Sequence, residues 1–364
     1  MSGNPQENLH PKREAIGAAR GVAAHFTHAS SRENFLYMAD SFASFGTPLF
    51  AALSRAAADD DALRAIAEHA TPGQPIAYLF LCAAQYLLLR NPQEPLAQYF
   101  PSTSPGPLPL TQAYPVFREF CLRYADELKR IVSTRTLQTT APERCGILVP
   151  ALHHVHGRTG APLNLIEIGC SAGLLLLFDR YRYEIGSTHL GDAGAQVFIK
   201  PEIRGREPRG VQLPPVASRR GVDLSPVDPG DADARLWLRA LTFPDWESHH
   251  RNLGGALALR AQIPLDITRG DALAVLPGMV AAAAEPLCLF HSYCIYQWPA
   301  AVRDRFEDLI CDLSKSRTIH RIGIESCGAE FGEATYLEYR GGQLAHSTVL
   351  ARLEGYGRWL EWLA

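Results

Sequence analysis

The N-terminal part of the chain shows the periodicity of amphipathic helices. Between residues 32 and 70 apolar side chains recur at spacings of three and four, with a Gly-Thr-Pro interruption at 46–48. Residues 115–135 repeat this spacing and carry their charges on the opposite face. The apolar run 76–89 is too short to span a bilayer and predicts a buried helix. We therefore expect residues 15–145 to be helical.

Beyond residue 160 the pattern changes to short apolar runs that end in Gly, Asp or His. Helix-like stretches separate several of these runs, as in a sheet built from parallel β-α-β units. The runs occupy residues 163–169, 220–226, 263–273, 286–293 and 320–326. Residues 333–354 then show two strand patterns around Gly341-Gly342, which predicts an antiparallel hairpin.

Together these patterns predict an α/β protein with a mostly parallel sheet and an antiparallel hairpin at its C-terminal end. The expected domains are a helical N-terminal domain or lid at 1–145 and a sheet domain at 146–364. The first two strands lie too far apart for a single helical crossover. We therefore expect an insertion at about 187–215, with one extra strand at 195–203.

The segment at the end of the first predicted strand, Gly169-Cys170-Ser171-Ala172-Gly173, fits two different motifs. One is the G-x-S-x-G elbow that exposes a nucleophilic serine, here Ser171. The other is a glycine-rich turn that holds a nucleotide cofactor. A hydrolase elbow follows several strands of its sheet, whereas residues 163–169 are the first strand of this chain. Strand count therefore favours the cofactor turn.

Acid and histidine candidates for a hydrolase triad do exist downstream, at Asp271, His320 and His346. The serine hydrolase therefore stays an alternative hypothesis.

The cofactor turn explains more of the local sequence. Gly169 lets the chain turn sharply off the strand, and Gly173 lets the backbone approach a ligand. Glu167 is the one charged residue in an apolar strand end, and a carboxylate suits a cationic or hydroxyl-bearing ligand. The dinucleotide fingerprint G-x-G-x-x-G fits poorly, because Ser171 and Leu174 stand at two of its glycine positions.

This turn resembles the first motif of class I S-adenosylmethionine-dependent methyltransferases. Asp223 in "GVDLSP" and Asp271 in "RGDAL" resemble the acidic ends of the second and third strands of those enzymes. The resemblance implies a Rossmann-like sheet of seven strands, with Asp223 on the ribose and Asp271 at the adenine. Asp192, inside the insertion, is a rival to Asp223. The implied cofactor-binding residues are Glu167, Gly169, Cys170, Ser171, Gly173, Asp223, Asp271 and Ala272.

Over nearly its whole length the chain also resembles the bacterial domain-of-unknown-function 2332 family. The resemblance rests on stretches that include "QTTAPERCGILVPAL" (138–152), "FHSYCIYQWP" (290–299) and "GYGRWLEWL" (355–363). The family implies a methyltransferase-like fold without an assigned reaction. Polar residues usual in the family are replaced here at positions 140–141, Leu175 and Tyr356, which keeps a non-catalytic protein among the hypotheses.

The composition and net charge of the chain indicate which classes of binding partner to expect. The chain has 364 residues, of which 47% are hydrophobic and 20% charged, and a net charge of -3. This balance is that of a globular protein and gives no basis for nucleic acid or an anionic membrane as the main partner. The arginine-rich stretch 204–220 is the local exception, and we expect a solvated surface loop there.

The cysteine and histidine residues indicate the cellular compartment to expect and whether to expect a bound metal ion. The eight cysteines are scattered and form no C-x-x-C pair, which favours a reducing compartment over disulfides or zinc. The N-terminus lacks the apolar segment of a secretory signal, so we expect a cytoplasmic location. His153 and His156 lie three apart with no carboxylate beside them, so no metal is expected.

The leading functional hypothesis is methyl transfer from S-adenosylmethionine to a small-molecule or protein acceptor. His291, helped by Tyr296, would orient or deprotonate the acceptor, because His291 ends the strand nearest the expected reaction centre. His291 can equally be a hydrogen-bonded wall of the pocket. A non-catalytic nucleotide-binding or sensor protein, built on the same turn, is the second alternative.

Overall fold

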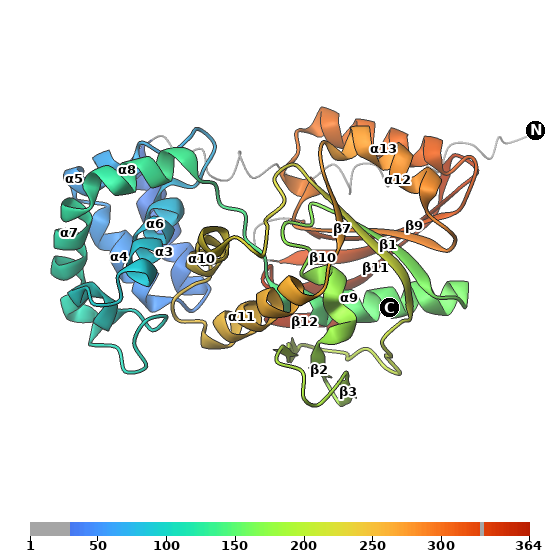
Figure 1. Cartoon of the computed structure of the whole chain (residues 1–364), viewed down its shortest axis with the longest axis horizontal. Coiled ribbons are helices and arrows are strands. Elements are labelled where there is room, and N and C mark those ends of the chain that lie inside the picture. Colours follow the sequence, from blue (N-terminus) through green and yellow to red (C-terminus); the bar gives the residue numbers. More distant parts are fainter. Residues whose placement is uncertain (1–29, 328–330) are drawn as a thin grey trace, which may run out of the picture. The chain divides into compact units, whose positions relative to one another are not determined.

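The computed structural model describes residues 30–327 and 331–364. Their backbone forms two compact units. Residues 30–140 and 227–261 form the helical unit, and residues 141–226 and 262–364 form the sheet unit (Figure 1). The expected helical start at residues 15–29 and the N-terminus assessed for a secretory signal lie outside the described residues.

The helical unit confirms the helical pattern of the N-terminal sequence. Its α-helices are α3 (Ser31–Ser44), α4 (Pro48–Ala57), α5 (Asp61–Ala67), α6 (Ile76–Arg90), α7 (Ala113–Arg123), α8 (Ala125–Thr134), α10 (Ala232–Ala240) and α11 (Glu247–Gln262). The last residue of α11 is assigned to the sheet unit. Two 3-10 turns, η1 (Pro95–Tyr99) and η2 (Leu110–Gln112), connect α6 to α7.

Local sequence explains where these helices begin. Ser30 and Glu33 form a reciprocal capping box at the start of α3. Pro48 stands at the first position of α4, directly after the predicted interruption. Helix α6 is buried at every position from 77 to 88, as expected of an apolar run that ends in a single arginine.

The chain returns to the helical unit after residue 226. Helix α10 packs against α6, and the buried Gln85 amide donates to the carbonyl oxygens of Ala240 and Thr242 at 2.9 and 2.7 Å. Phe243, in the turn between α10 and α11, stacks on Tyr78 with ring centroids 5.2 Å apart. Residues 227–261 therefore complete the core of the helical unit.

His250 makes the stability of the helical unit sensitive to pH. Burial lowers the pKa of its imidazole from the usual 6.5 to about 4, although a hydrogen bond to the Phe243 carbonyl opposes the shift. Between pH 6.5 and about 4, the unfolded chain therefore binds a proton at His250 that the folded chain does not bind. We expect this group to remove roughly 3 kcal/mol of stability as pH falls from 6.5 to 4. Urea unfolding at several pH values measures the slope.

Two variants isolate the contribution of His250. His250→Gln keeps a donor toward Phe243 but cannot titrate, so its stability should fall less steeply below pH 6.5. His69→Gln, in the exposed turn that follows α5, is the matched control and should keep the wild-type slope. Equal slopes for His250→Gln and the wild type would exclude His250 as the source.

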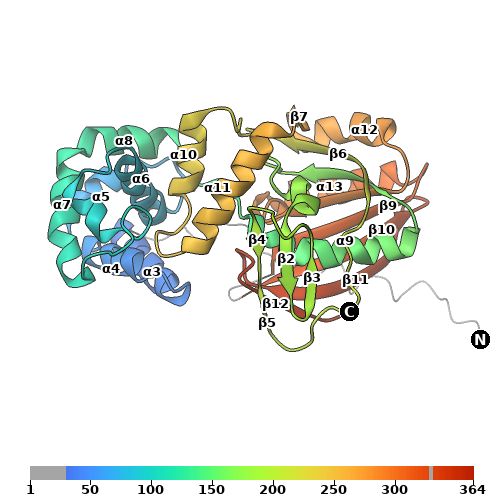
Figure 2. The same cartoon turned by 60° about the horizontal axis from the view of Figure 1, so that its bottom comes forward.

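The sheet unit contains a nine-stranded sheet and a small three-stranded sheet (Figures 1 and 2). In order across the large sheet its strands are β5 (Glu202–Ile203), β12 (Trp359–Trp362), β11 (Gln343–Leu353), β10 (Gly332–Arg340), β9 (Ile319–Ser326), β8 (Leu287–Ser292), β1 (Leu163–Ile168), β6 (Val216–Asp223) and β7 (Asp266–Arg269). Strands β9, β8, β1, β6 and β7 are mutually parallel.

The predicted mostly parallel sheet and its terminal hairpin are confirmed. Residues 340 and 343 pair across Gly341 and Gly342, both at positive φ, which is the geometry that a two-residue hairpin turn needs. The expected number of seven strands was too low. The C-terminal tryptophans form strand β12, and a short strand from the insertion pairs with it.

Two further expectations need correction. The run of leucines after Gly173 is typical of a helix that follows a glycine turn, but these residues form only a 3-10 segment, η4 (Leu175–Arg180), with non-helical backbone at Leu177. The single extra strand expected at 195–203 is instead two short strands, β4 (Phe198–Ile199) and β5. Strand β4 joins β2 (Arg182–Ile185) and β3 (Thr188–Leu190) in the small sheet, while β5 joins the large one.

The arginine-rich stretch is a loop only in part. Strand β6 begins at Val216, so Arg219 and Arg220 lie in the sheet. Arg219 is stabilised there by a bidentate contact with Asp179, at 2.7 and 3.0 Å.

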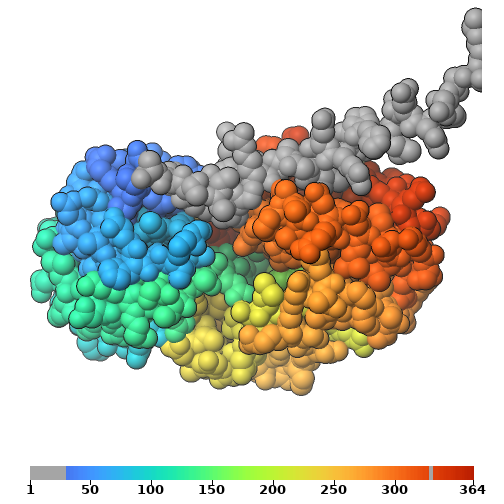
Figure 3. All heavy atoms as spheres, turned by 90° about the horizontal axis from the view of Figure 1, so that it is seen from above, coloured from blue at the N-terminus to red at the C-terminus, as the bar shows by residue number. Residues whose placement is uncertain are grey.

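Helices cover both faces of the large sheet. Helices α12 (Ala272–Ala282) and α13 (Ala300–Leu313) pack on one face, and their atoms form the orange surface in Figure 3. Helix α9 (Cys145–Thr159), which follows the 3-10 turn η3 (Pro142–Arg144), lies on the other face against β9, β10 and β11 (Figure 1). None of the helices in the described ranges combines the length and apolarity that a bilayer-spanning helix needs.

Candidate functional site

The order of the parallel strands marks one edge of the sheet. Numbered along the chain, the five parallel strands lie in the order 3-2-1-4-5, with β1 and β8 at the centre. From β1 the chain moves toward β6, and from β8 it moves toward β9. Open parallel sheets bind ligands where the order reverses, outside the carboxyl ends of the strands. The candidate site therefore lies beyond residues 168 and 292.

Two strained residues stand at this point. Ser171, just after β1, has φ 50°, and Tyr293, just after β8, has φ 51°. They are the residues other than glycine that have positive φ in the described ranges. Left-handed backbone is unfavourable for a side chain with a Cβ, and in folded proteins such strain gathers at functional sites. Both outliers flank the same reversal of strand order.

Glu167 is buried beside them. Its side chain is 2% exposed, and its Oε2 atom has no hydrogen-bond partner among the described residues. Burial and the neighbouring Asp223 raise the pKa of this carboxyl well above its usual range, although Arg144 opposes the shift. A buried carboxylate without a full set of partners is the kind of group that a cationic ligand would satisfy.

Asp223 lies at the end of β6, where the cofactor hypothesis requires it. Its two carboxylate oxygens accept hydrogen bonds from the backbone N–H groups of Ser171 and Ser225, at 2.8 and 2.7 Å. The carboxylate therefore holds the turn after β1 in place. Asp192, its rival, is exposed in the insertion and accepts from the Gly194 N–H.

Arg144 and two tyrosines complete this side of the site. The Arg144 side chain is buried, its Nε donates to the Gly355 carbonyl oxygen at 2.8 Å, and its guanidinium lies 4.6 Å above the Tyr293 ring. Tyr296 packs edge-on against Tyr293, with ring centroids 5.5 Å apart. Burial raises the pKa of Tyr296 to about 12, so its hydroxyl is a donor at neutral pH.

His291 lies on the opposite face of the sheet. Strand register aligns His291 with Ile168 and Gly323, whereas Glu167 aligns with Phe290. Its ring contacts Phe306 of α13, and its Nδ1 atom lies 2.5 Å from Oε1 of Glu325. The structure therefore does not bring His291 together with Glu167 and Asp223.

Glu325 was not singled out from the sequence. Besides contacting His291, its carboxylate accepts from the backbone N–H groups of Cys294, Ile295 and Tyr296, at 3.1–3.2 Å. It thereby fixes the segment that follows β8. Its sequence signal is the one that identified Glu167, a single acid at the end of an apolar strand.

The remaining predicted residues have structural contacts. Asp271 is exposed, and its side chain caps α12 by accepting from the Leu273 N–H at 3.0 Å. Ala272 is the first residue of α12 and packs in the core. The Cys170 side chain points toward β6, where its sulfur lies 2.6 Å from the position of a Cβ on Gly221. Gly173 has φ 74° and closes a tight turn onto the Cys170 carbonyl.

Gly169 has little free space above it. It adopts φ 72°, and a Cβ at this position would overlap the Cys294 side chain, whose own Cβ would be 2.8 Å away. We expect Gly169→Ala to lower the free energy of unfolding by about 2–4 kcal/mol, from left-handed strain and overpacking together. Chemical denaturation measures this loss.

The double variant separates the two causes. Cys294→Gly in the Gly169→Ala background removes the overlap but leaves the strained φ, so part of the stability should return. No recovery would mean that Cys294 does not pack on Gly169.

The elbow hypothesis finds little support in these contacts. The Ser171 hydroxyl is buried and has no hydrogen-bond partner among the described residues, so no histidine activates it. In the same residues, no group of three or more His, Cys, Asp or Glu side chains is arranged to hold a metal ion.

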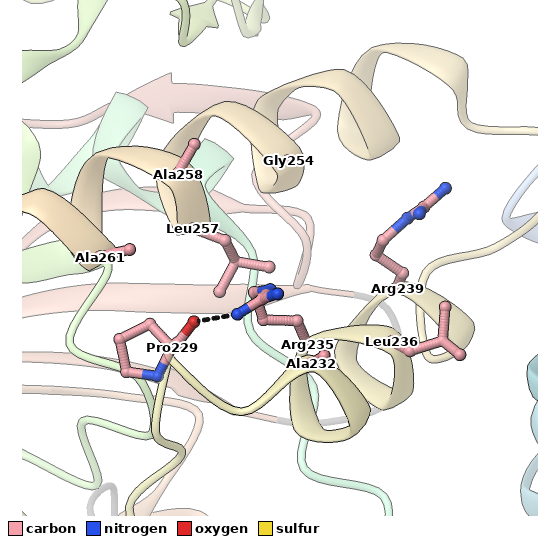
Figure 4. Close-up of a pocket in the computed structure, with 9 residues that line it drawn as sticks. All are labelled: Pro229, Ala232, Arg235, Leu236, Arg239, Gly254, Leu257, Ala258 and Ala261. Atoms are coloured by element: carbon pink, nitrogen blue, oxygen red, sulfur yellow. Dashed lines mark hydrogen bonds between the residues drawn. The ribbon is translucent and has the colours of Figure 1, made fainter.

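A separate groove of about 520 Å³ lies in the helical unit, between α10 and α11 (Figure 4). Its lining is mainly alanine and leucine, and the Arg235 guanidinium already donates to the Pro229 carbonyl oxygen at 2.6 Å. None of the predicted site residues lines this groove.

An open, mostly parallel sheet with a buried carboxylate at its reversal point places the chain among α/β proteins. A family model, DUF2332, described as an uncharacterized protein conserved in bacteria, matches residues 32–362. The chain belongs to this family, as its sequence resemblance indicated. Searches of curated proteins and of solved structures found no match.

Proposed function

We propose that this chain binds S-adenosylmethionine at the carboxyl edge of β1 and transfers its methyl group to a small-molecule or protein acceptor. The observation that carries the proposal is that Ser171 and Tyr293, both left-handed, follow the neighbouring strands β1 and β8, and that β1 ends in the incompletely satisfied Glu167 carboxylate. Backbone strain lowers the stability of a protein, and proteins retain it where it helps to form a binding site.

The topology supports the same proposal. The strand order 3-2-1-4-5 followed by antiparallel strands is compatible with the Rossmann-like sheet that the sequence resemblance implies. The glycine turn after β1 and the acid that ends β6 meet through the hydrogen bond from the Ser171 N–H to Asp223. These are the first two motifs of the resemblance.

The acidic residues at this edge are complementary in charge to the cofactor. When bound, S-adenosylmethionine supplies an electrophilic methyl group on a positively charged sulfur. Glu167 and Asp223 favour a cation at this edge, since both carboxyls lie at the carboxyl ends of neighbouring strands. Cys294 covers Gly169, so the segment after β8 must shift when a ligand enters. Tyr293 and Tyr296 then exclude water, the main requirement of methyl transfer.

In this proposal His291 is a positioning residue. Its Nδ1 is engaged by Glu325, and the pair holds the segment from 293 to 297 against the turn. The placement favours this role over acid–base catalysis on the acceptor.

Calorimetric titration with S-adenosylmethionine and S-adenosylhomocysteine tests the proposal. We expect micromolar binding by the wild type and loss of binding by Glu167→Ala. Glu202→Ala, an exposed glutamate on β5, is the matched control and should bind normally. Failure of the wild type to bind either compound would refute the assignment, and labelling of Ser171 by a fluorophosphonate would then support the hydrolase.

A non-catalytic sensor is the second candidate. Two observations favour it: Cys294 covers Gly169, and His291, the predicted acid–base residue, lies on the opposite face of the sheet from Glu167. Binding of S-adenosylmethionine without formation of S-adenosylhomocysteine, in the presence of a bacterial extract that offers acceptors, would select this candidate.

A further inference from the structure

The groove between α10 and α11 lies between two helix faces of the same spacing (Figure 4). Helix α10 lines it with residues 232, 235, 236 and 239, and α11 lines it with residues 254, 257, 258 and 261. Such spacing is typical of a face that packs on a neighbour. Here glycine and alanine occupy most of the α11 positions, and a Cβ added to Gly254 would meet no atom within 4 Å. The small side chains therefore leave the space between the faces open.

The base of the groove is apolar. Leu257 is 3% exposed and points from α11 toward α10, where Leu236 is partly buried (Figure 4). Gly254, Ala258 and Ala261 are exposed along the same wall. Apolar surface that is open to water gains free energy when an alkyl chain covers it.

The charged residues of the groove are arginines without acidic partners. Arg235 and Arg239 line it, and no acid among the described residues does. Each arginine between residues 30 and 140 forms an ion pair with an acidic side chain. Within the described residues neither Arg235 nor Arg239 forms one. The groove therefore combines an apolar base with positive charge that the helical unit does not neutralise.

Arg235 keeps one edge of its guanidinium for a ligand. Its Nη1 donates to the Pro229 carbonyl oxygen at 2.6 Å, and its Nε and Nη2 have no hydrogen-bond partner within the described residues. Those two nitrogens form the side of the fork that matches both oxygens of a carboxylate. Arg239 follows one turn later on α10 and adds a second positive charge.

We infer that this groove binds a medium-chain alkyl carboxylate, with the carboxylate on Arg235 and the chain along Leu236 and Leu257. The lining residues cover two turns of each helix, roughly 10 Å, which an extended chain of medium length spans. The volume of 520 Å³ lies in the range of small-ligand sites, about 300–1,000 Å³. A protein partner would need a wider surface, since each side of a stable interface has roughly 20–30 residues. The site lies in the helical unit and is independent of the proposed cofactor.

Calorimetric titration of the full chain with decanoate, below the concentration at which it forms micelles, tests the inference. We expect decanoate to bind, and octanoate to bind about 15-fold more weakly, because each buried methylene contributes about four-fold. Decyltrimethylammonium has the same chain with a positive head group, so the arginines should weaken its binding by at least about ten-fold relative to decanoate.

Two variants locate the ligand. Ala258→Trp fills the groove from an exposed position and should abolish decanoate binding, whereas Ser248→Trp, exposed on α11 outside the lining, should bind normally. Arg235→Gln should weaken decanoate by about 10- to 100-fold, the range for hydrogen bonds to charged groups. Its binding of 1-decanol should stay unchanged, which shows that the groove is still folded. Arg251→Gln removes an arginine of α11 that does not line the groove and is the matched control.

Three results would overturn the inference. Equal binding of decanoate by the wild type and Ala258→Trp would place the ligand elsewhere. Equal affinities for decanoate and decyltrimethylammonium would mean that the arginines select no anion. No binding of decanoate, together with a dimer that sedimentation detects in the wild type and not in Ala258→Trp, would assign the groove to a second copy of the chain.

Discussion

Replacing Phe243 by alanine should destabilise the helical unit by about 3–5 kcal/mol, the range for a fully packed phenylalanine. The ring is 1% exposed and contacts Phe42, Phe50 and Tyr78 at centroid distances of 5.2–6.1 Å. It also meets Trp246 edge-on at 4.6 Å. Truncation removes these contacts and leaves a cavity at the centre of the unit. Urea unfolding followed by far-ultraviolet circular dichroism measures the loss.

The matched control is Tyr37→Ala on α3. Tyr37 is 42% exposed, so the same kind of truncation should change the free energy of unfolding by less than about 1 kcal/mol. A loss of similar small size for Phe243→Ala would mean that residues 227–261 do not share the core of the helical unit. The variant therefore tests a contact between residues almost 200 positions apart in the sequence.

That distant contact shows what local patterns leave out. The three- and four-residue spacing before residue 145 and the short apolar runs after 160 predicted helices and strands correctly, because periodicity records which faces are buried. Periodicity does not show which other helix or strand a buried face packs against. Helices α10 and α11 read as crossover segments between strands, yet α10 packs on α6 of the helical unit.

The segment after Gly173 shows a second limit. Its leucines resemble the start of a buried helix, but the segment forms a 3-10 turn with non-helical backbone at Leu177. Helix α9, which precedes β1, packs on β9 and β10 and also contacts this segment.

The candidate site was predicted in part. Glu167, Ser171 and Asp223 stand out because a polar residue at the end of an apolar strand needs a reason, and the structure brings these three together. The same pattern also singled out His291 and Asp271, but the side chains of these two residues make other contacts. Alternation along β8 turns His291 to the other face, and the start of α12 uses Asp271 as its cap. A one-residue difference in register decides the face, and strand ends do not reveal it.

Glu167→Gln should raise the stability of the protein at neutral pH while it abolishes binding of S-adenosylhomocysteine. Burial and Asp223 raise the pKa of the Glu167 carboxyl in the folded state. Above the unfolded pKa near 4.5 the folded chain therefore holds this proton more tightly than the unfolded chain does, and stability falls as pH rises. Glutamine does not ionise, so the variant should gain about 1–2 kcal/mol at neutral pH. Urea unfolding at several pH values measures the gain.

A second buried glutamate provides a control of opposite sign. Contacts with Arg158, Tyr336 and Arg340 hold the pKa of Glu338 at about 2 against its burial, so its contribution is present above pH 4.5 and is lost as pH falls. Glu338→Gln should therefore destabilise the protein at neutral pH and leave ligand binding intact. If both variants lose stability, Glu167 is a structural residue like Glu338. Opposite signs would show that the fold keeps Glu167 for a ligand, against its own stability.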